Sequence, residues 1–464
     1  MKKAFLYLII LTVTTSMALQ ISSAAGGNVK VRHTVIAATG DAAPAGGNYL
    51  TSSFSNVRLN ARHDVVFDAS VGTTTGVFVG DGRTTSTIAL GENPDPTAPS
   101  FGSVSNPFIT TNGDVVFNVN NADIYKTDGK SIVPFVQTGD AAPGGGTVVQ
   151  TLERATNDNG VVAYSAFVSD STATQGIFRS DGTQTVAIAR DDVSTPTGGS
   201  FTLVGNTVIN NRGQVAFYSN MIGGSAEFGI FRGEGGDLTP IFVSNQIAPG
   251  GTTFADFGNP VINNHGQIAT TCSLNNNTSG IFVGDGTDTV AIAVQGQPAP
   301  KSTSYSGQFL APTRLNDQGE VAFAARLTGA TGASGIFRGD GKRTIPVALT
   351  GTNAPGTTGT FASFRDLQFL NDGRVVFIAT LTVGVGGVNA TNNMGIWIGK
   401  SDEDLQLVVR TGDVIEGKVL TRLPQFSQAT NQFEINENDV LWVGTFGIAK
   451  AVVLSRILGD NDEQ

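Results

Sequence analysis

The sequence predicts an all-β protein, and within that class a single β-propeller of eight four-stranded antiparallel blades. Three observations predict it. A unit of about 50 residues recurs along the chain, each copy reads as four short strands separated by turn residues, and no segment shows a helical period. Four-stranded meanders joined end to end by loops are propeller blades, which form rings of four to eight.

The copy at residues 254–296 shows the unit well. Its first strand, A, ends in Pro260–Asn263, strand B is Gly266–Leu274, strand C is Gly280–Gly284 and strand D is Thr289–Val294. All four are rich in Val, Ile, Phe and Thr, the residues that favour a pleated, half-buried surface.

The turns of the unit have a physical explanation. The A–B turn reads Asn-x-x-Gly, as in 263–266, where the Asn side chain can bind backbone two residues on and the Gly permits a positive φ. His63 and Asp439 take the Gly position in two copies, and both are expected to be left-handed because their residue types tolerate that conformation. The C–D turn carries Asp-Gly, as in 285–286, which is a strong hairpin signal.

Strand D is expected at one edge of each blade and strand A at the other, because three copies carry a proline in strand D (Pro134, Pro240 and Pro346) and proline removes a ladder donor. Strands A, B and C can be found eight times, but strand D follows them only seven times. Residues 34–38 match the missing copy. The N-terminal strand is therefore predicted to complete the last blade and close the ring.

The two ends of the chain lie outside the predicted ring. Residues 1–25 have the layout of a secretory signal peptide: Lys2 and Lys3, an apolar run, and small residues where cleavage near Ala24 or Ala25, or after Ala18, would occur. The propeller is predicted over 31–456, followed by an acidic C-terminal tail, 457–464. The mature protein is expected to be secreted, periplasmic or at the cell surface, with no transmembrane segment, because no other apolar run approaches about 18 residues.

The composition argues against several classes of partner and site. The net charge is −10 and no Lys/Arg cluster occurs, so nucleic acid is not an expected partner. Cys272 is the only cysteine, which excludes an intramolecular disulfide and a cysteine zinc site, and we expect it to be a small buried hydrophobe on a strand. The chain is expected to be a monomer.

The repeat also carries a family resemblance. The core Asn-x-x-Gly-x-Val-x-Phe, explicit at 210–217 and 316–323, together with Gly-Ile-Phe and Gly-Asp-Gly, resembles a family of exported bacterial tandem-repeat proteins known by NxxGxVxF or NxxGxxAF motifs. The match covers nearly the whole mature chain. The resemblance implies export and a propeller-like repeat fold, with no established activity, so no catalytic residue is carried over.

Three aspartates in the D–A loops, Asp41, Asp140 and Asp413, are the candidate metal ligands. With loop carbonyls they could coordinate Ca²⁺, which takes several oxygen ligands. The structural alternative is a turn held by the Asp side chain before a proline bend, and Gln246 and Gln297 favour it because they keep the loop without a carboxylate. No other cofactor is expected.

Histidine and tryptophan offer little for catalysis. His33 is placed before the first strand, and His63 and His265 lie in A–B turns, so neither a catalytic triad nor a zinc site is expected. Trp397 and Trp442 replace core residues of the repeat, which favours packing over sugar stacking.

Function is expected on the face that carries the B–C and D–A loops, because these vary between copies whereas the A–B and C–D turns are nearly uniform. The longest are 381–394 and the loop between 412 and 436. This favours an exported, non-enzymatic binding or scaffold propeller with a protein or glycan ligand. One alternative is a polysaccharide lyase or hydrolase at the central channel, for which the repeat-breaking Glu153, Arg154 and Glu434 are candidates. Another is a structural protein of the cell surface. The sequence does not decide whether the protein is an enzyme.

Overall fold

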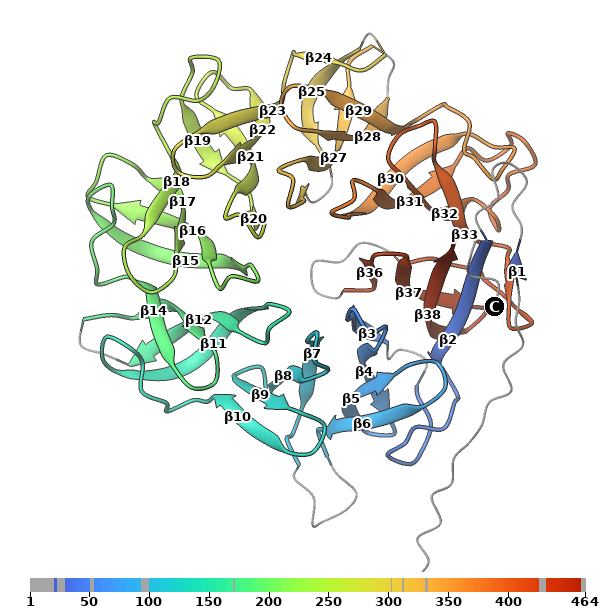
Figure 1. Ribbon diagram of the computed structural model, residues 1–464, viewed down its shortest axis with the longest axis horizontal. Coiled ribbons are helices and arrows are strands. Elements are labelled where there is room, and N and C mark those ends of the chain that lie inside the picture. The colour runs from blue at the N-terminus through green and yellow to red at the C-terminus, as the bar shows by residue number, and fades with distance from the viewer. Residues whose placement is uncertain are drawn as a thin grey trace, which may run out of the picture.

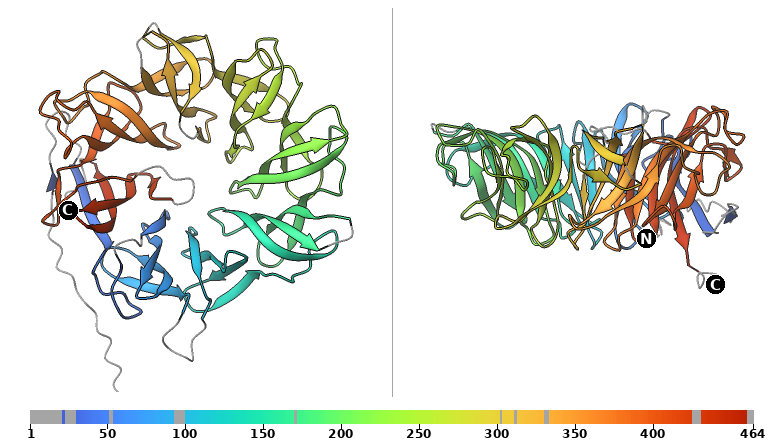
Figure 2. Two further views of the ribbon diagram at one scale, coloured as in Figure 1. Left: turned by 180° about the vertical axis from the view of Figure 1, so that it is seen from behind. Right: turned by 90° about the horizontal axis from the view of Figure 1, so that it is seen from above.

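The computed structural model is a ring of eight four-stranded antiparallel sheets, as predicted (Figure 1). It describes residues 21–22, 30–50, 54–92, 100–169, 172–301, 303–310, 313–329, 333–424 and 431–459. Seen edge-on, the ring is a disc one blade thick (Figure 2). No helix long and apolar enough to cross a membrane occurs within these ranges.

Each blade runs from an inner strand A to an outer strand D (Figure 1). The A strands are β3 (Ser55–Leu59), β7 (Val104–Ile109), β11 (Thr147–Thr156), β15 (Ser200–Ile209), β19 with β20 (Phe254–Phe257 and Val261–Ile262), β25 with β26 (Thr303–Phe309 and Arg314–Leu315), β30 (Phe361–Phe369) and β36 (Phe433–Asn436). The B strands are β4 (Val65–Val71), β8 (Val115–Val119), β12 (Val162–Ser169), β16 (Val215–Ile222), β21 (Ile268–Leu274), β27 (Val321–Leu327), β31 (Val375–Leu381) and β37 (Asp439–Phe446).

The C strands are β5 (Thr74–Gly80), β9 (Asp123–Thr127), β13 (Gln175–Ser180), β17 (Phe228–Gly233), β22 (Ser279–Gly284), β28 (Ser334–Gly339), β32 (Met394–Gly399) and β38 (Ala449–Leu458). The D strands are β6 (Thr85–Leu90), β10 (Ile132–Val136), β14 (Thr185–Arg190), β18 (Thr239–Val243), β23 (Thr289–Val294), β29 (Thr344–Leu349), β33 (Gln406–Arg410) and β2 (Lys30–Ala38). Short strands outside this scheme are β1 (Ile21–Ser22), β24 (Pro298–Ala299), β34 (Val414–Ile415) and β35 (Lys418–Val419).

The N-terminal strand closes the ring, as the strand inventory predicted. Strand β2 pairs antiparallel with β38, from Lys30 opposite Leu458 to Ala38 opposite Ala451. Strand β1 pairs with the free edge of β2 and falls inside the segment predicted to be a signal peptide. The rest of that segment lies outside the described residues, and the signal peptide stays a prediction. Strand β38 runs to Leu458, and residues 460–464 of the tail are also outside the described ranges.

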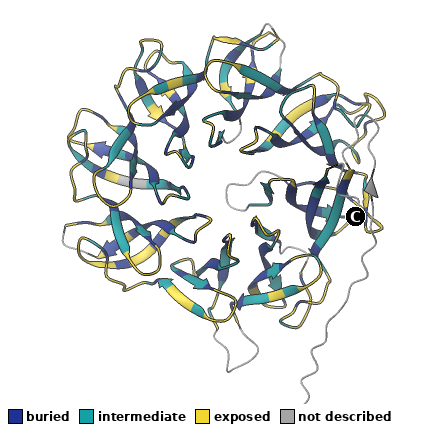
Figure 3. Ribbon diagram, viewed as in Figure 1, coloured by how far each residue is buried: buried dark blue, intermediate teal, exposed yellow. Residues whose placement is uncertain are grey.

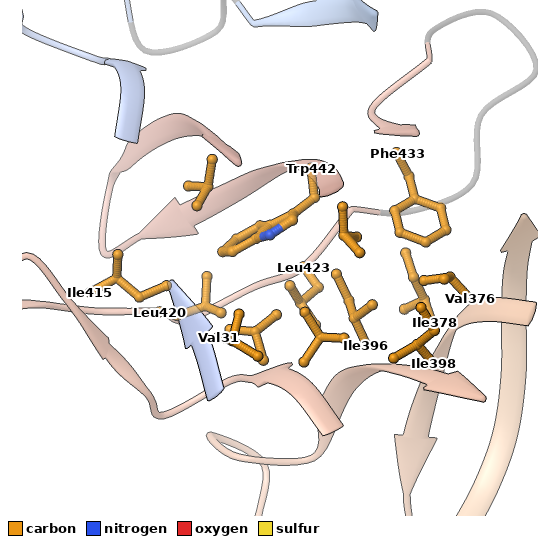
Figure 4. Packing of buried hydrophobic residues seen from close by; sticks show 14 of the residues in the cluster. Val31, Val376, Ile378, Ile396, Ile398, Ile415, Leu420, Leu423, Phe433 and Trp442 are labelled. Carbon is orange, nitrogen blue, oxygen red and sulfur yellow. The ribbon is translucent and has the colours of Figure 1, made fainter. Parts of the chain in front are cut away.

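The hydrophobic core is itself a ring of clusters, each shared by two neighbouring blades (Figure 3). Between blades 7 and 8, Val31 of β2 lies in one cluster with Val376 of β31 and Trp442 of β37 (Figure 4). Both tryptophans are fully buried, and Trp397 stacks on Phe377 with the ring centroids 6.2 Å apart. The expectation that they pack the core is confirmed.

The glycine of the Gly-Ile-Phe motif is required by close packing. At Gly176 a Cβ would lie 2.6 Å from the ring of Phe178 two residues on, and the copy at Gly280 is equally crowded, 2.8 Å from Phe282. The aromatic ring thus covers its own strand, and any side chain in its place would push the ring out of the core. Cys272 is buried in β21, as expected.

In blades 1, 3, 4 and 5 the Asn of the A–B turn makes hydrogen bonds in two directions. Within the turn, Oδ1 of Asn210 accepts from the backbone N–H of Arg212 (3.1 Å) and Gln214 (2.9 Å), as the sequence predicted. Across the blade interface, Nδ2 of Asn210 donates to the carbonyl oxygen of Asn263, 2.9 Å away, and Asn263 repeats this toward Asn316 at 2.9 Å. These side chains are buried. The repeated Asn therefore links blades as well as shaping the turn.

Blade 8 breaks this pattern and corrects one expectation. His63 has a φ of 68°, as predicted for a Gly position, but Asp439 does not adopt the left-handed region and Glu437 does, with a φ of 49°. The turn is shorter here, because Asn436 pairs directly with Asp439. Asp439 therefore lies in β37, where it is 1% exposed, pairs with Arg456 at 2.8 Å and contacts His63 of blade 1.

His33 also departs from the expectation, because it lies inside β2 rather than before it. Its Nδ1 is 2.8 Å from Oγ of Ser455 in β38, and the same Oγ accepts a hydrogen bond from Nε1 of Trp442 at 2.8 Å. A hydrogen-bonded chain thus runs from the closing strand through β38 into the core of blade 8.

This histidine predicts a loss of stability in acid. Burial lowers the pKa of His33 to about 4, whereas an unfolded histidine titrates near about 6.5. Below about pH 6.5 His33 is protonated in the unfolded chain, but in the folded chain it stays neutral down to about pH 4. The free energy of unfolding therefore declines as the pH falls through that range. We expect the thermal midpoint to drop more between pH 7 and pH 5 in the wild type than in His33→Asn, which can still bind Ser455. Parallel pH profiles of the two proteins would contradict this.

Candidate functional site

On the face that carries the B–C and D–A loops, the loops of blades 7 and 8 differ most from the other copies of the repeat. They comprise residues 381–394 between β31 and β32, 411–424 between β33 and β36, and 446–449 between β37 and β38, and we refer to these residues as the blade 7–8 loop surface. The sequence predicted this position from loop length alone, and the structure brings the three loops together.

Hydrogen bonds hold these loops against one another. The N–H of Thr421 donates to the carbonyl oxygen of Thr445 at 2.8 Å, and Gly447 N–H donates to Oγ1 of Thr421 at 3.2 Å. On the other side, Nε of Arg410 donates to the carbonyl oxygen of Asn392. The surface is therefore one connected structure fixed on two blades.

Aliphatic side chains project from this surface while others anchor it. Ile415, Leu420 and Leu423 lie in the cluster between blades 7 and 8 and are at most 4% exposed (Figure 4). The exposed ones are Val383 (57%), Val385 (40%), Val414 (49%), Val419 (51%) and Ile448 (89%). Five exposed apolar side chains on loops that are fixed in place make this surface a candidate binding site.

The three candidate metal ligands lie in separate loops and bind their own backbone. Oδ2 of Asp41 accepts from the N–H of Ala38 at 2.9 Å, and Asp140 and Asp413 accept in the same way from the residue three positions earlier, at 2.8 and 2.7 Å. Gln246 makes the equivalent contact with Val243 at 3.3 Å. The structural alternative therefore accounts for this motif. Within the described ranges no three His, Cys, Asp or Glu side chains are grouped to hold a metal.

A second candidate site lies at the centre of the ring, where the A strands meet. Nη1 of Arg58 in β3 is 3.4 Å from Oε2 of Glu434 in β36, and Nδ2 of Asn431 donates to the same oxygen at 3.0 Å. Nε of Arg314 in β26 donates to Oε1 of Gln368 at 3.1 Å, and Nε2 of Gln368 donates to the carbonyl of Phe433 at 3.1 Å. Side chains of blades 6, 7, 8 and 1 thus form a polar belt. Together with Arg154 of blade 3 we call these residues the axial cluster.

Burial shifts the pKa values of the axial cluster. It raises the pKa of Glu434 to about 7, against the opposing charge of Arg58, although the side chain is still 25% exposed. Burial also lowers the pKa of Arg154 to about 9, and the like charge of Arg58 contributes. The pKa of Arg314 is lowered by burial as well. The ring centre is thus reached by water but is a poor environment for unpaired charge.

The residues considered for catalysis are only partly brought together. Oε2 of Glu153 accepts from the N–H of Asn206 in blade 4 at 2.6 Å, while Arg154 binds Asn118 in blade 2. No hydrogen bond or ion pair joins Glu153 to Glu434 among the residues that the structure describes. The two carboxylates therefore bind different blades, Glu153 in blade 4 and Glu434 in blades 1 and 8.

Sequence reasoning missed Arg58, Arg314 and Gln368. A signal was present: each precedes the end of its inner strand at a position that is apolar in other copies, such as Val208 and Val261. A polar residue at this position of the repeat could have marked them, as it marked Glu434.

Comparison with known proteins gives a family and distant structural likenesses. The chain matches the model of a family of unknown function, DUF7453, over residues 5–280 and 273–439. No curated protein matches it. Among solved structures, it is similar to virginiamycin B lyase from Staphylococcus aureus (10% identity, 88% of this chain and 95% of that chain covered, TM-score 0.33) and Sqt1 from Saccharomyces cerevisiae (9%, 87% and 97%, 0.42). It is also similar to prolyl oligopeptidase B from Galerina marginata (10%, 87% and 55%, 0.42). Likeness at this level transfers no function.

Proposed function

The chain belongs to the DUF7453 family, whose function is unknown, and from its own geometry we propose that it is an exported, non-enzymatic propeller that binds a protein partner on the blade 7–8 loop surface. The observation that carries the proposal is the set of exposed aliphatic side chains, headed by Ile448 at 89%, on loops that are fixed by hydrogen bonds and a buried core. The predicted signal peptide supports export.

The chemistry of the surface favours a protein over a glycan. Sugar rings stack on exposed aromatic side chains, but both tryptophans are buried and the exposed apolar residues of this surface are Val and Ile. Aliphatic side chains bind by excluding water, and polar groups around them, such as Glu416 and Lys418, would form the rim of a protein interface. The fixed scaffold reduces the entropy that binding would cost.

A substitution series tests the surface. We expect Ile448→Asp and Val419→Asp to weaken partner binding at least about tenfold each, because each would bury a charge in the interface. The control is Val133→Asp: Val133 is 49% exposed, close to the 51% of Val419, but lies on the outer strand β10 away from the loops. None of the three should change the thermal midpoint by much, since all three side chains are exposed.

The partner can be identified by photo-crosslinking. A photoreactive amino acid at position 448, in the full chain expressed in its native host, should give a discrete protein adduct that the same label at position 133 does not give. The captured protein then serves as the ligand for the affinity measurements. Equal adducts at both positions, or binding to glycans that Ile448→Asp does not weaken, would refute the proposal.

A catalytic alternative has one observation in its favour. A carboxyl with a pKa raised to about 7, as at Glu434, could act as a general acid in glycan cleavage near neutral pH. Cleavage of a polysaccharide that is lost in Glu434→Gln without a change in fold would favour this alternative over a binding function.

A further inference from the structure

A pocket of about 460 Å³ lies between blades 6 and 7 and shares no residue with either candidate site described above. It is lined by β28, β29 and the turn between them in blade 6, and by residues 400–403 of the connection between β32 and β33 in blade 7 (Figure 1). Pro300, Ile345 and Pro346 form an apolar part of the lining. The size falls within the range of about 300–1,000 Å³ that small-molecule sites occupy.

Blade 7 departs from the repeat at this pocket. Residues 340–343 join strands C and D in blade 6, whereas residues 400–405 join them in blade 7, so the connection is two residues longer. The longer connection reaches blade 6. The N–H of Asp402 donates to the carbonyl oxygen of Pro346 at 3.1 Å, and Oδ2 of the same aspartate is 3.1 Å from Nζ of Lys301. The wall that blade 7 contributes is therefore fixed to its neighbours.

Arg338, in a Gly-Ile-Phe-Arg copy of the repeat, also departs from the pattern. In blade 3 the corresponding Arg179 donates to the carbonyl oxygen of Gly213 in the next blade, at 3.1 Å. Arg338 instead donates through Nε to the carbonyl oxygen of Lys400 at 2.8 Å and through Nη1 to Oε1 of Glu320 at 2.7 Å. Its Nη2 has no partner in the described chain, and the side chain is 15% exposed. This guanidinium therefore lines the pocket with donors available to a ligand.

The lining is positively charged in an acidic protein. It holds two carboxylates and four cationic side chains, Lys301, Arg338, Arg343 and Lys400. The lining thus has a net charge of +2, whereas the whole chain has −10. The first two cations are each ion-paired with a carboxylate. Within the described ranges, no hydrogen bond or ion pair holds the side chain of Arg343 or Lys400. These two charges are available to a bound anion.

We propose that this pocket binds a small organic anion, in which an oxyanion group such as a phosphate or a carboxylate is joined to a compact apolar body. Arg338, Arg343 and Lys400 bind the oxyanion, because the planar fork of a guanidinium matches two of its oxygens and an ammonium adds a third donor group. The apolar part of the lining contacts the body of the ligand. The proposal does not rest on the protein partner of the blade 7–8 loop surface.

Calorimetric titration of the full chain tests the ligand chemistry. The probes are phenyl phosphate, benzoate, inorganic phosphate and benzyl alcohol, at constant ionic strength near pH 7. We expect phenyl phosphate or benzoate to bind saturably, and at least about tenfold more tightly than inorganic phosphate and benzyl alcohol, which each lack one part of the ligand. Whichever of the two binds identifies the oxyanion. If neither binds, or if neither binds more tightly than inorganic phosphate, the proposal is wrong.

Substitutions place the binding in this pocket. Arg343→Gln and Lys400→Gln should each weaken binding about tenfold, because each removes a cation that has no carboxylate partner. Asp402→Asn should tighten it severalfold, because it removes an opposing charge and releases Lys301. Lys342→Gln is the matched control: Lys342 is the exposed neighbour of Arg343 in the same turn, but it does not line the pocket. The same loss of affinity in Lys342→Gln and Arg343→Gln would show a general effect of charge and would overturn the site.

Discussion

Deleting Arg32–Asp41 is expected to open blade 8 and to lower the thermal midpoint by roughly 5 °C or more. The deletion removes the partner of β38 from Arg456 to Ala451 and the buried side chains of Ile36, Ala37 and Ala38. Burial of apolar side chains such as these contributes about 5 kcal/mol in sum. The exposed edge of β38 would also be left without hydrogen-bond partners.

In the deleted protein, blade 8 should unfold at a lower temperature than the other blades. Trp442 is buried in blade 8 and linked through Ser455 to His33, whereas Trp397 lies in blade 7. In a Trp397→Phe background, the fluorescence of Trp442 should shift to longer wavelength in the deleted protein at temperatures where the other blades remain folded.

A permuted chain provides the matched control. Because Lys30 pairs with Leu458, residues 30–41 can be moved to follow Leu458 through a short glycine linker and still pair with β38. This chain should recover most of the lost midpoint and the original Trp442 emission. An unchanged midpoint in the deleted protein would mean that β2 does not hold the ring.

The fold was predictable because its signals are local and repeated. The Asn-x-x-Gly and Asp-Gly turns recur along the chain and a proline marks the outer strand in three copies, so counting strands predicted both eight blades and the closing role of residues 34–38. Aligning the copies to one another gives the wrong position where an A–B turn is shorter than in the other units. Asp439 was aligned to a glycine position, but the shorter turn of blade 8 places it in a strand.

The candidate sites were predictable only in part. Loop length pointed to the blade 7–8 loop surface, because residues in excess of the repeat unit can be recognised in a single sequence. The axial cluster was not visible, because Arg58 and Glu434, like Arg314 and Gln368, belong to different blades, and their contacts depend on how neighbouring blades pack. The second direction of the Asn hydrogen bonds was missed for the same reason, since the acceptor lies 53 residues away, as for Asn210 and Asn263.

The Asn of the A–B turn has two roles, in the turn and between blades, and substitutions of Asn263 can separate them. Asn263→Ala should lower the free energy of unfolding by about 1–3 kcal/mol, because the N–H groups of His265 and Gln267 lose their side-chain acceptor and the carbonyl of Asn316 keeps only the N–H of Gly319 as a donor. The measurement is denaturant unfolding. Asn276→Ala is the control: Asn276 also accepts from a turn N–H in the same blade, but it is exposed and donates to no other blade.

Asn263→Asp isolates the inter-blade bond. The carboxylate keeps an acceptor for His265 and Gln267, but it places an oxygen against the carbonyl of Asn316 where Nδ2 donated at 2.9 Å. If the link between blades matters, this variant should lose most of the stability that Asn263→Ala loses, although its turn is intact. If it is as stable as the wild type, the Asn of the repeat serves the turn alone, and the blades are held together by their shared hydrophobic clusters and the closing strand.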